Sequence, residues 1–228
     1  DYMRNAMRLS ALQQTKTLFL FSHDTIALGQ DGPTHQPIEQ LDSIRAMPGL
    51  TLFRPADAVE TKAAWKYVLQ YAKGPSVIAM SRQALPVLPG TIKHAADGVL
   101  KGGYIVSSSQ KEIPDGIIMA TGSEVSLAIE VQTELRVNGF DVSVVSMPCT
   151  DLFDKQSQEY KDSVLIPSVQ NRMSIEFGST LSWGRYTGLC GINIGIDRFG
   201  ASGNADDIVK ALKLDKQSIV HRYMKKFK

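Results

Sequence analysis

The chain has 228 residues, 43% of them hydrophobic and 21% charged, which is typical of a globular protein with one large or two modest domains. A formal net charge of +2 does not favour nucleic acid or an anionic membrane as a partner. No apolar run approaches the roughly 20 residues of a membrane span, and no signal peptide is visible. The only cysteines, Cys149 and Cys190, are far apart, which favours free thiols in a reducing cytoplasm.

The first third of the chain alternates helical and strand patterns. Residues 2–14 already have a helical apolar face, so we expect a fragment of a longer protein. Asp57 and Glu60 have the spacing of a capping box, which predicts a helix start. Strands are expected at 17–22, 50–55 and 76–81, with helices at 36–47 and from Asp57 to Gly74. This alternation predicts βαβ crossovers in a parallel sheet.

Residues 86–115 are rich in proline and glycine and contain one strand-like piece, YIVSS, so we interpret this stretch as a connection between domains. Periodicity then resumes with strands at 117–120, 141–147, 172–178 and 191–197, and helices fill the gaps and close the chain at 203–213 and 215–226. The predicted fold is therefore α/β, with parts of two α/β domains, each a mainly parallel sheet flanked by helices. The predicted divisions are 1–88, a connector at 89–112, and 113–228.

The stretch FSHDTIALGQDGPTHQP, residues 21–37, concentrates titratable side chains directly after a predicted strand. Ligands of open parallel sheets bind beyond the carboxyl ends of the strands, so His23, Asp31 and His35 are candidate functional-site residues. Arg82 follows the strand at 76–81 and is expected at the same rim, where a guanidinium suits a phosphate or carboxylate.

Other interpretations of these residues stay open. The aspartates of this loop could make Asx turns beside solvated histidines, and Arg82 could make a surface salt bridge. His23, Asp24, Asp31 and His35 are also metal-ligand types. The stretch ATGSEVS resembles an anion site at a helix start, although Thr121 and Glu124 favour a structural cap. His94 and His221 are expected to be incidental.

Several motifs together resemble the transketolase family. They are GQDGPTHQPIEQL, RAMPGLTLFRPAD and SRQALP in the first part, and ATGSEVSLA, VSMPCTDLFDKQ and GIDRFGASG in the second. The resemblance covers the whole chain and implies part of a thiamine diphosphate pyrimidine-binding domain followed by a transketolase-type C-terminal domain. It implies transfer of a two-carbon ketol unit from a ketose phosphate to an aldose phosphate, a step of the pentose phosphate pathway, by a cytoplasmic homodimer.

The resemblance also implies roles for individual residues. His35 lies near the reacting carbon and helps move protons, while Asp31 hydrogen-bonds a substrate hydroxyl. His23 and Arg82 bind the sugar hydroxyls and terminal phosphate, and Tyr2, with His35, contacts the cofactor near its aminopyrimidine ring. Sugar phosphates are thus the expected partners, with neither nucleic acid nor membrane.

The family's diphosphate-binding domain has no counterpart in these residues. Its Gly-Asp-Gly metal motif and its activating glutamate do not occur here, so no metal ligand is assigned. Thiamine diphosphate and Mg²⁺ are then expected to be bound mainly by that other domain, and this chain alone is expected to be inactive. A dihydroxyacetone synthase-like ketol transferase and a non-catalytic dimerisation module remain alternatives.

Overall fold

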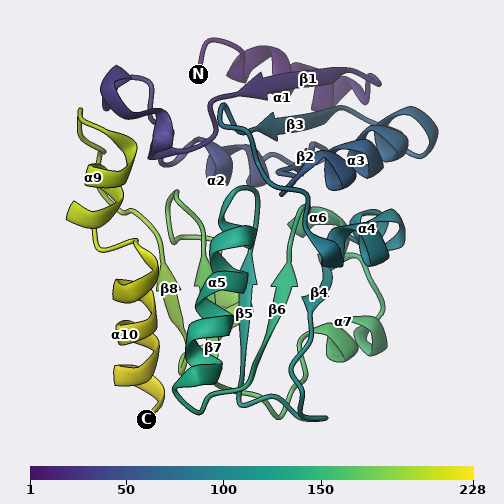
Figure 1. Ribbon diagram of the computed structural model, residues 1–228. Helices are drawn as coiled ribbons and strands as arrows, with labels where there is room; N and C mark the ends of the chain where they lie inside the picture. The colour runs from purple at the N-terminus through teal and green to yellow at the C-terminus, as the bar shows by residue number, and fades with distance from the viewer.

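The computed structural model describes all residues from Asp1 to Lys228 as two packed α/β units (Figure 1). The first unit is a three-stranded parallel sheet in the order β1-β3-β2. Its elements are α1 (Arg4–Gln13), β1 (Leu18–Ser22), η1 (Ile26–Asp31), α2 (Gln40–Arg45), β2 (Thr51–Phe53), α3 (Ala58–Gln70) and β3 (Ser76–Met80). The predicted βαβ alternation is confirmed, with a shorter second helix than the pattern suggested.

The second unit is a five-stranded sheet in the order β4-β6-β5-β7-β8, parallel except for β4. Its strands are β4 (Tyr104–Ser107), β5 (Gly116–Ala120), β6 (Val142–Ser146), β7 (Arg172–Ile175) and β8 (Ile192–Ile194). The helices that follow α3 are α4 (Pro89–Lys101), α5 (Glu124–Val137), α6 (Thr150–Asp154), α7 (Gln158–Val164), α8 (Gly184–Thr187), α9 (Ala205–Ala211) and α10 (Lys216–Phe227). The predicted fold class is confirmed.

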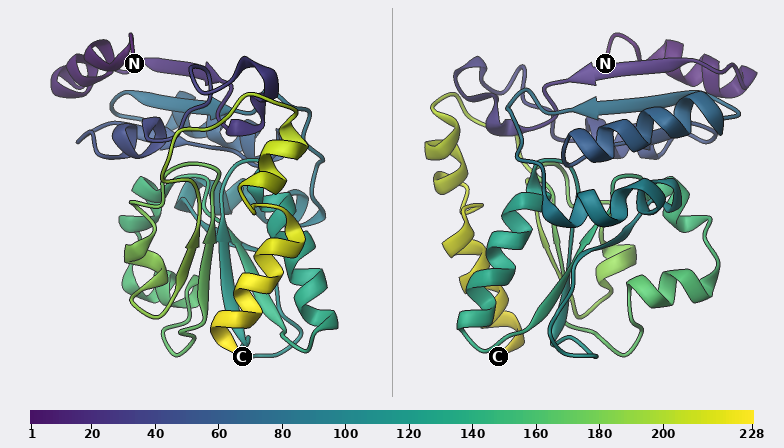
Figure 2. Two further views of the ribbon diagram at one scale, coloured as in Figure 1. Left: turned by 90° about the vertical axis from the view of Figure 1, so that its left-hand side faces the viewer. Right: turned by 45° about the vertical axis from the view of Figure 1, so that its right-hand side comes forward.

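Helices cover both faces of the second sheet (Figure 2). Alternate side chains of β5 divide between two hydrophobic clusters: Ile118 belongs to the cluster that includes α5 and α10 residues, and Ile117 to the cluster with α6, α7 and α8 residues. This is the period-two alternation of a strand buried on both faces. No helix of the chain combines the length and hydropathy that a bilayer crossing requires.

The segment expected as a connector, 89–112, contains regular structure. Pro89 begins α4, because proline is tolerated in the first turn of a helix, and Gly102 ends it with a left-handed φ of 86°. Tyr104 then enters β4, which pairs antiparallel with β6 at the edge of the second sheet. Pro89 and Gly102, which suggested a loop, are thus the two ends of a helix. The division of the chain at this stretch stays a prediction.

The first unit lies across the carboxyl ends of the second sheet (Figures 1 and 2). Arg54, which follows β2, makes hydrogen bonds that join the two units. Its side chain is fully buried. Its backbone N–H donates to the carbonyl of Pro148, after β6, at 2.8 Å. Its own carbonyl accepts from Thr121 Oγ1 and Gly122 N, after β5, each at 3.1 Å. The backbone of one residue thus ties β2 to two strands of the other sheet.

The Arg54 guanidinium extends this junction with ion pairs. Nε donates to Asp24 Oδ2 at 2.8 Å, and Nη1 donates to Glu124 Oε2 at 2.5 Å. Glu176, which follows β7, lies 3.4 Å from Nη1 and accepts two hydrogen bonds from Arg45 at 2.7 and 2.8 Å. We call Asp24, Arg45, Arg54, Glu124 and Glu176 the junction network.

The predicted capping box of Thr121 and Glu124 was wrong. The N-cap of α5 is Ser123, without a side-chain cap, because the Thr121 hydroxyl and the Glu124 carboxylate are both engaged by Arg54. Burial raises the pKa of Glu124 although Arg54 opposes the rise. Burial also opposes ionisation of Glu176, yet Arg45 and Arg54 hold its pKa below the usual value.

Replacing Arg54 with methionine should lower the free energy of unfolding by about 3–5 kcal/mol, because it leaves several carboxylates buried without their cation. Urea denaturation followed by circular dichroism measures the change. The matched control is Arg185→Met, which removes an exposed partner of Asp154 and should alter stability by less than about 1 kcal/mol. Equal losses in the two variants would contradict a structural role for the junction network.

Candidate functional site

The loop that carries the candidate residues leaves β1 through a left-handed turn. His23 has a φ of 68°, a conformation that costs a residue with a side chain about 1–2 kcal/mol. Asp24 turns inward to pair with Arg54, and Thr25 caps η1 by accepting a hydrogen bond from Ala27 N at 3.0 Å. The strand-end placement of His23 and Asp24 is confirmed, but Asp24 belongs to the interior and His23 to the surface.

A segment of the second unit holds this loop in place. The buried Gln36 amide donates to the carbonyls of Ala201 at 2.9 Å and Ile26 at 3.1 Å. Ser202 Oγ donates to the carbonyl of Gln30 at 2.9 Å. A Cβ at Gly29 would approach the carbonyl of Gly203 to 3.1 Å, so the close approach favours glycine. The loop is therefore fixed at Gln30 and Gln36 by a segment that is distant in sequence.

Two of the predicted substrate-binding residues meet. Arg82 Nη1 donates to Asp31 Oδ2 at 3.2 Å, and both side chains are about half exposed. Together they line a hollow of about 340 Å³ whose far wall is the Gly203–Ala205 segment. A guanidinium and a carboxylate at the mouth of one hollow can donate and accept hydrogen bonds to the same polyhydroxylated ligand.

The remaining predicted residues lie elsewhere on the loop. His23 lines a separate, partly apolar hollow of about 170 Å³ with Met7, Phe21 and Ile44, and its Nδ1 lies 2.8 Å from Ser22 Oγ. His35 is exposed, with Nδ1 3.0 Å from Thr34 Oγ1. Tyr2 is fully exposed at the start of the chain. The two histidines and Tyr2 thus do not share the Asp31–Arg82 hollow.

The possibility of a metal site gains no support from the geometry. The chain has no group of three or more His, Cys, Asp or Glu side chains that could hold a metal ion. Asp24, one of the proposed ligands, is committed to Arg54 instead. A diphosphate needs a divalent ion with oxygen ligands in near-octahedral array, so these residues alone do not fit thiamine diphosphate, although the apolar hollow beside His23 offers contacts for a ring.

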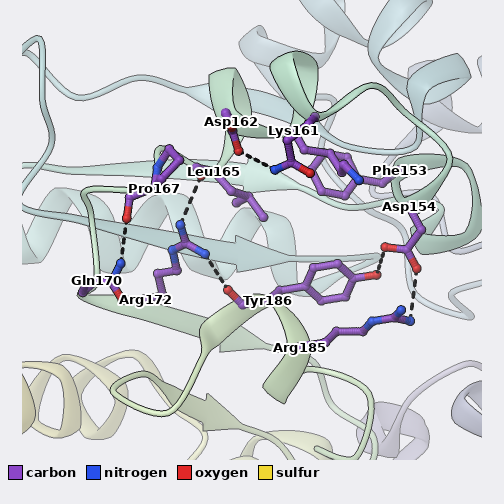
Figure 3. Close-up of a pocket in the computed structure, with 11 residues that line it drawn as sticks. Phe153, Asp154, Lys161, Asp162, Leu165, Pro167, Gln170, Arg172, Arg185 and Tyr186 are labelled. Atoms are coloured by element: carbon purple, nitrogen blue, oxygen red, sulfur yellow. Dashed lines mark hydrogen bonds and ion pairs between the residues drawn. The ribbon is translucent and has the colours of Figure 1, made fainter.

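A larger hollow of about 440 Å³ lies in the second unit, between the α6–α7 segment and β7 with α8 (Figure 3). Its charged groups are mostly engaged with neighbours. Asp154 binds Arg185 at 3.1 Å and the Tyr186 hydroxyl at 2.8 Å. The Arg172 guanidinium donates to four backbone carbonyls. Burial lowers the pKa of Arg172, and the nearby Asp162 carboxylate only partly opposes this. This hollow contains none of the predicted site residues.

Sequence reasoning missed the residues that position the loop. Gln36 and Arg54 lie within motifs that were noticed, but their partners Ala201 and Glu124 are 165 and 70 positions away. The only signal was for Arg54, a charged residue at the end of an apolar strand pattern, and Gln36 gave none. Cys149 is buried and Cys190 exposed, and both are free thiols, as expected.

The fold and the site together define a class of protein: two packed α/β units with a polar loop at the carboxyl end of a strand in the first sheet. Two family models match it: "Transketolase, pyrimidine binding domain" over residues 1–87 and "Transketolase-like TK C-terminal domain" over residues 102–215. The chain belongs to the transketolase family.

Individual relatives agree with this assignment. The transketolase of Bacillus subtilis is 51% identical over 222 residues, which are 97% of this chain and 33% of that protein. The chloroplastic transketolase of Zea mays is 51% identical over 221 residues, covering 96% of this chain and 32% of that protein. A crystal structure of Pichia stipitis transketolase in complex with sedoheptulose-7-phosphate superposes with a TM-score of 0.91 at 42% identity, over 99% of this chain and 32% of that one. The chain therefore spans about a third of the length of the relatives it matches.

Replacing His23 with glycine should give a more stable protein than replacing it with alanine, by about 0.5–1 kcal/mol, because only glycine adopts the left-handed backbone without strain. This order is the reverse of the usual one. The two variants share the loss of the imidazole, so each is the other's control in urea denaturation. A more stable alanine variant would mean that the turn at His23 relaxes when its side chain is removed.

Proposed function

We propose that this chain forms part of a transketolase that transfers a two-carbon ketol unit between sugar phosphates with thiamine diphosphate and Mg²⁺. The family assignment supports the reaction class, and the observation that carries the proposal is the Asp31–Arg82 pair at the mouth of its hollow. The Pichia relative in complex with a sugar phosphate supports the substrate class. The pathway and a cytoplasmic location are proposed on the same resemblance.

In this proposal the side chains of the loop bind and orient the substrate. Arg82 donates to the terminal phosphate, for which a planar guanidinium is well suited. Asp31 accepts a hydrogen bond from a sugar hydroxyl, and His23 binds another hydroxyl from the neighbouring hollow. His35 moves a proton at a substrate hydroxyl, because histidine exchanges protons near neutral pH. The cofactor, when bound, supplies the chemistry that breaks and forms the carbon–carbon bond.

We propose that the site is completed by residues outside these 228, with Mg²⁺ and the cofactor's diphosphate bound there. The support is the lack of a metal-ligating cluster here and the two-thirds of each relative that this chain does not match. Tyr2 and His35 are exposed and thus free to contact a cofactor held by another domain. We also propose a homodimer. The apolar side chains of Leu9, Leu12 and Leu20 are exposed on α1 and on the edge strand β1, a surface that a second copy could cover.

The proposed role of His35 can be tested by transplantation. The 228 residues would replace the matching third of the Bacillus subtilis transketolase, to which they are 51% identical. The hybrid should transfer ketol units, and His35→Ala within it should lower kcat by about 10²–10⁴-fold, the usual contribution of a positioned proton-transfer group. The matched control is His94→Ala, on the outer face of α4. An inactive hybrid, or a kcat that His35→Ala leaves unchanged, would contradict the proposal.

The 228-residue chain alone should neither bind thiamine diphosphate with micromolar affinity nor transfer ketol units. A few ring and hydroxyl contacts cannot offset the loss of freedom of the bound cofactor without the metal-bridged diphosphate. Calorimetric titration with thiamine diphosphate and Mg²⁺ measures the binding, and circular dichroism verifies that the chain is folded. Tight binding by the folded chain would show that it holds a complete cofactor site.

A further inference from the structure

The outer face of the C-terminal helix carries a hollow that the proposed function does not use. It has a volume of about 640 Å³ and is lined by residues of α10 and of the turn that joins α9 to α10. Helix α10 lies at the edge of the second unit (Figure 1). Only one of its lining residues, Leu212, is hydrophobic. The six polar lining residues are Lys213, Gln217, Ser218, His221, Arg222 and Lys225.

The residues that line this hollow include lysines and an arginine but no aspartate or glutamate. Helix α10, KQSIVHRYMKKF, contains three lysines and one arginine but no aspartate or glutamate. The charge of this one helix, +4 from those four residues, exceeds the net charge of +2 on the whole chain. Such a local excess of positive charge creates a field that attracts anions.

The cations that line the hollow have no carboxylate partner. Lys213, Arg222 and Lys225 take part in none of the ion pairs of the molecule, and the one bond of Arg222 is a long one of 3.5 Å to the Asn193 carbonyl. The nearest acid in sequence, Asp215, instead caps α10 by binding Ser218 N at 3.1 Å and Ser218 Oγ at 2.6 Å. Unlike the hollow of Figure 3, where Asp154 neutralises Arg185, this one presents unpaired positive charge.

Helix termini explain only part of this arrangement. Lysines in the last turn of a helix complement its dipole, which accounts for Lys225 and Lys226. Lys213 lies directly after the C-cap of α9, where the dipole of that helix favours a cation, and two residues before Asp215, the N-cap of α10. Lys213 also adopts a left-handed φ of 56°, a conformation that favours glycine. A lysine therefore occupies a position where the backbone alone would prefer glycine.

We propose that this hollow binds a small anion that carries several phosphate groups. Its volume falls in the range of small-molecule sites, and Arg222 with two lysines can contact separate phosphates. No aromatic side chain lines it for stacking on a nucleic-acid base, and one leucine is too little to insert into a bilayer. The ligand is therefore a soluble polyphosphate rather than a polynucleotide or a lipid surface.

The direct test is calorimetric titration of the 228-residue chain with sodium tripolyphosphate. Binding with micromolar affinity at low salt is expected, weakening at least tenfold in the Arg222→Gln, Lys225→Gln double variant and falling with added salt. The matched control, Lys161→Gln with Arg185→Gln at the hollow of Figure 3, should bind like the parent chain. No binding, or equal weakening in both double variants, would overturn the proposal. So would binding to RNA or to phosphatidylserine vesicles without binding to tripolyphosphate.

Lys213 allows a second test in which stability and binding move in opposite directions. Lys213→Gly relieves the left-handed backbone and should raise Tm by about 1–3 °C, while tripolyphosphate affinity should fall severalfold. A merely structural effect on the hollow would not combine a gain in stability with a loss of binding. Unchanged affinity in this more stable variant would remove Lys213 from the site and contradict the proposed ligand contacts.

Discussion

One buried guanidinium organises the junction between the two sheets. Arg54 follows β2 and meets the carboxyl ends of β5, β6 and β7 through its backbone and side chain. Burying such charges is expensive unless each is paired. With Arg45 it faces Asp24, Glu124 and Glu176, so the carboxylates outnumber the cations in this network. That excess, together with burial, is reflected in the raised pKa of Glu124.

Because of this junction, the edge of the second sheet where a ligand would normally bind is occupied by the protein itself. In an open parallel sheet the crevice at the carboxyl ends of the strands is the expected binding place. In the second unit that edge is filled by Arg54, and the glycine turn before α5 contacts the guanidinium, where a Cβ at Gly122 would lie 2.7 Å from Cζ. The ATGSEVS stretch therefore has a structural role, and the free carboxyl edge that remains is that of the first sheet.

Local patterns predicted most of the fold, because periodicity and caps depend on near neighbours. The Asp57 cap is formed as expected, by acceptance from Val59 N and Glu60 N. Helix α4 was missed, since Pro89 and Gly102 were interpreted as loop residues rather than as its two ends. The junction network could not be predicted, because nothing in one sequence pairs Arg54 with Glu124 or Glu176 across 70 and 122 positions.

The candidate site, like the fold, could be predicted only where it depends on residues that are close in sequence. The strand-end rule correctly placed His23 and Asp31 on the loop after β1 and Arg82 two residues after β3, but it could not say which side chains share a hollow. That depends on the left-handed turn at His23 and on the contacts of Gln36 with Ala201.

The second unit also fixes the shape of this loop. Asp24 is held through Arg54 to Glu124, and Gln36 and Gln30 are held by Ala201 and Ser202. These contacts lie at both ends and in the middle of the loop that presents Asp31. A loop rich in glycine and proline has no apolar core of its own, so its geometry must come from the surface on which it lies. The C-terminal unit therefore acts on the candidate site as its positioning scaffold, although none of the residues assigned to substrate or cofactor lies within it.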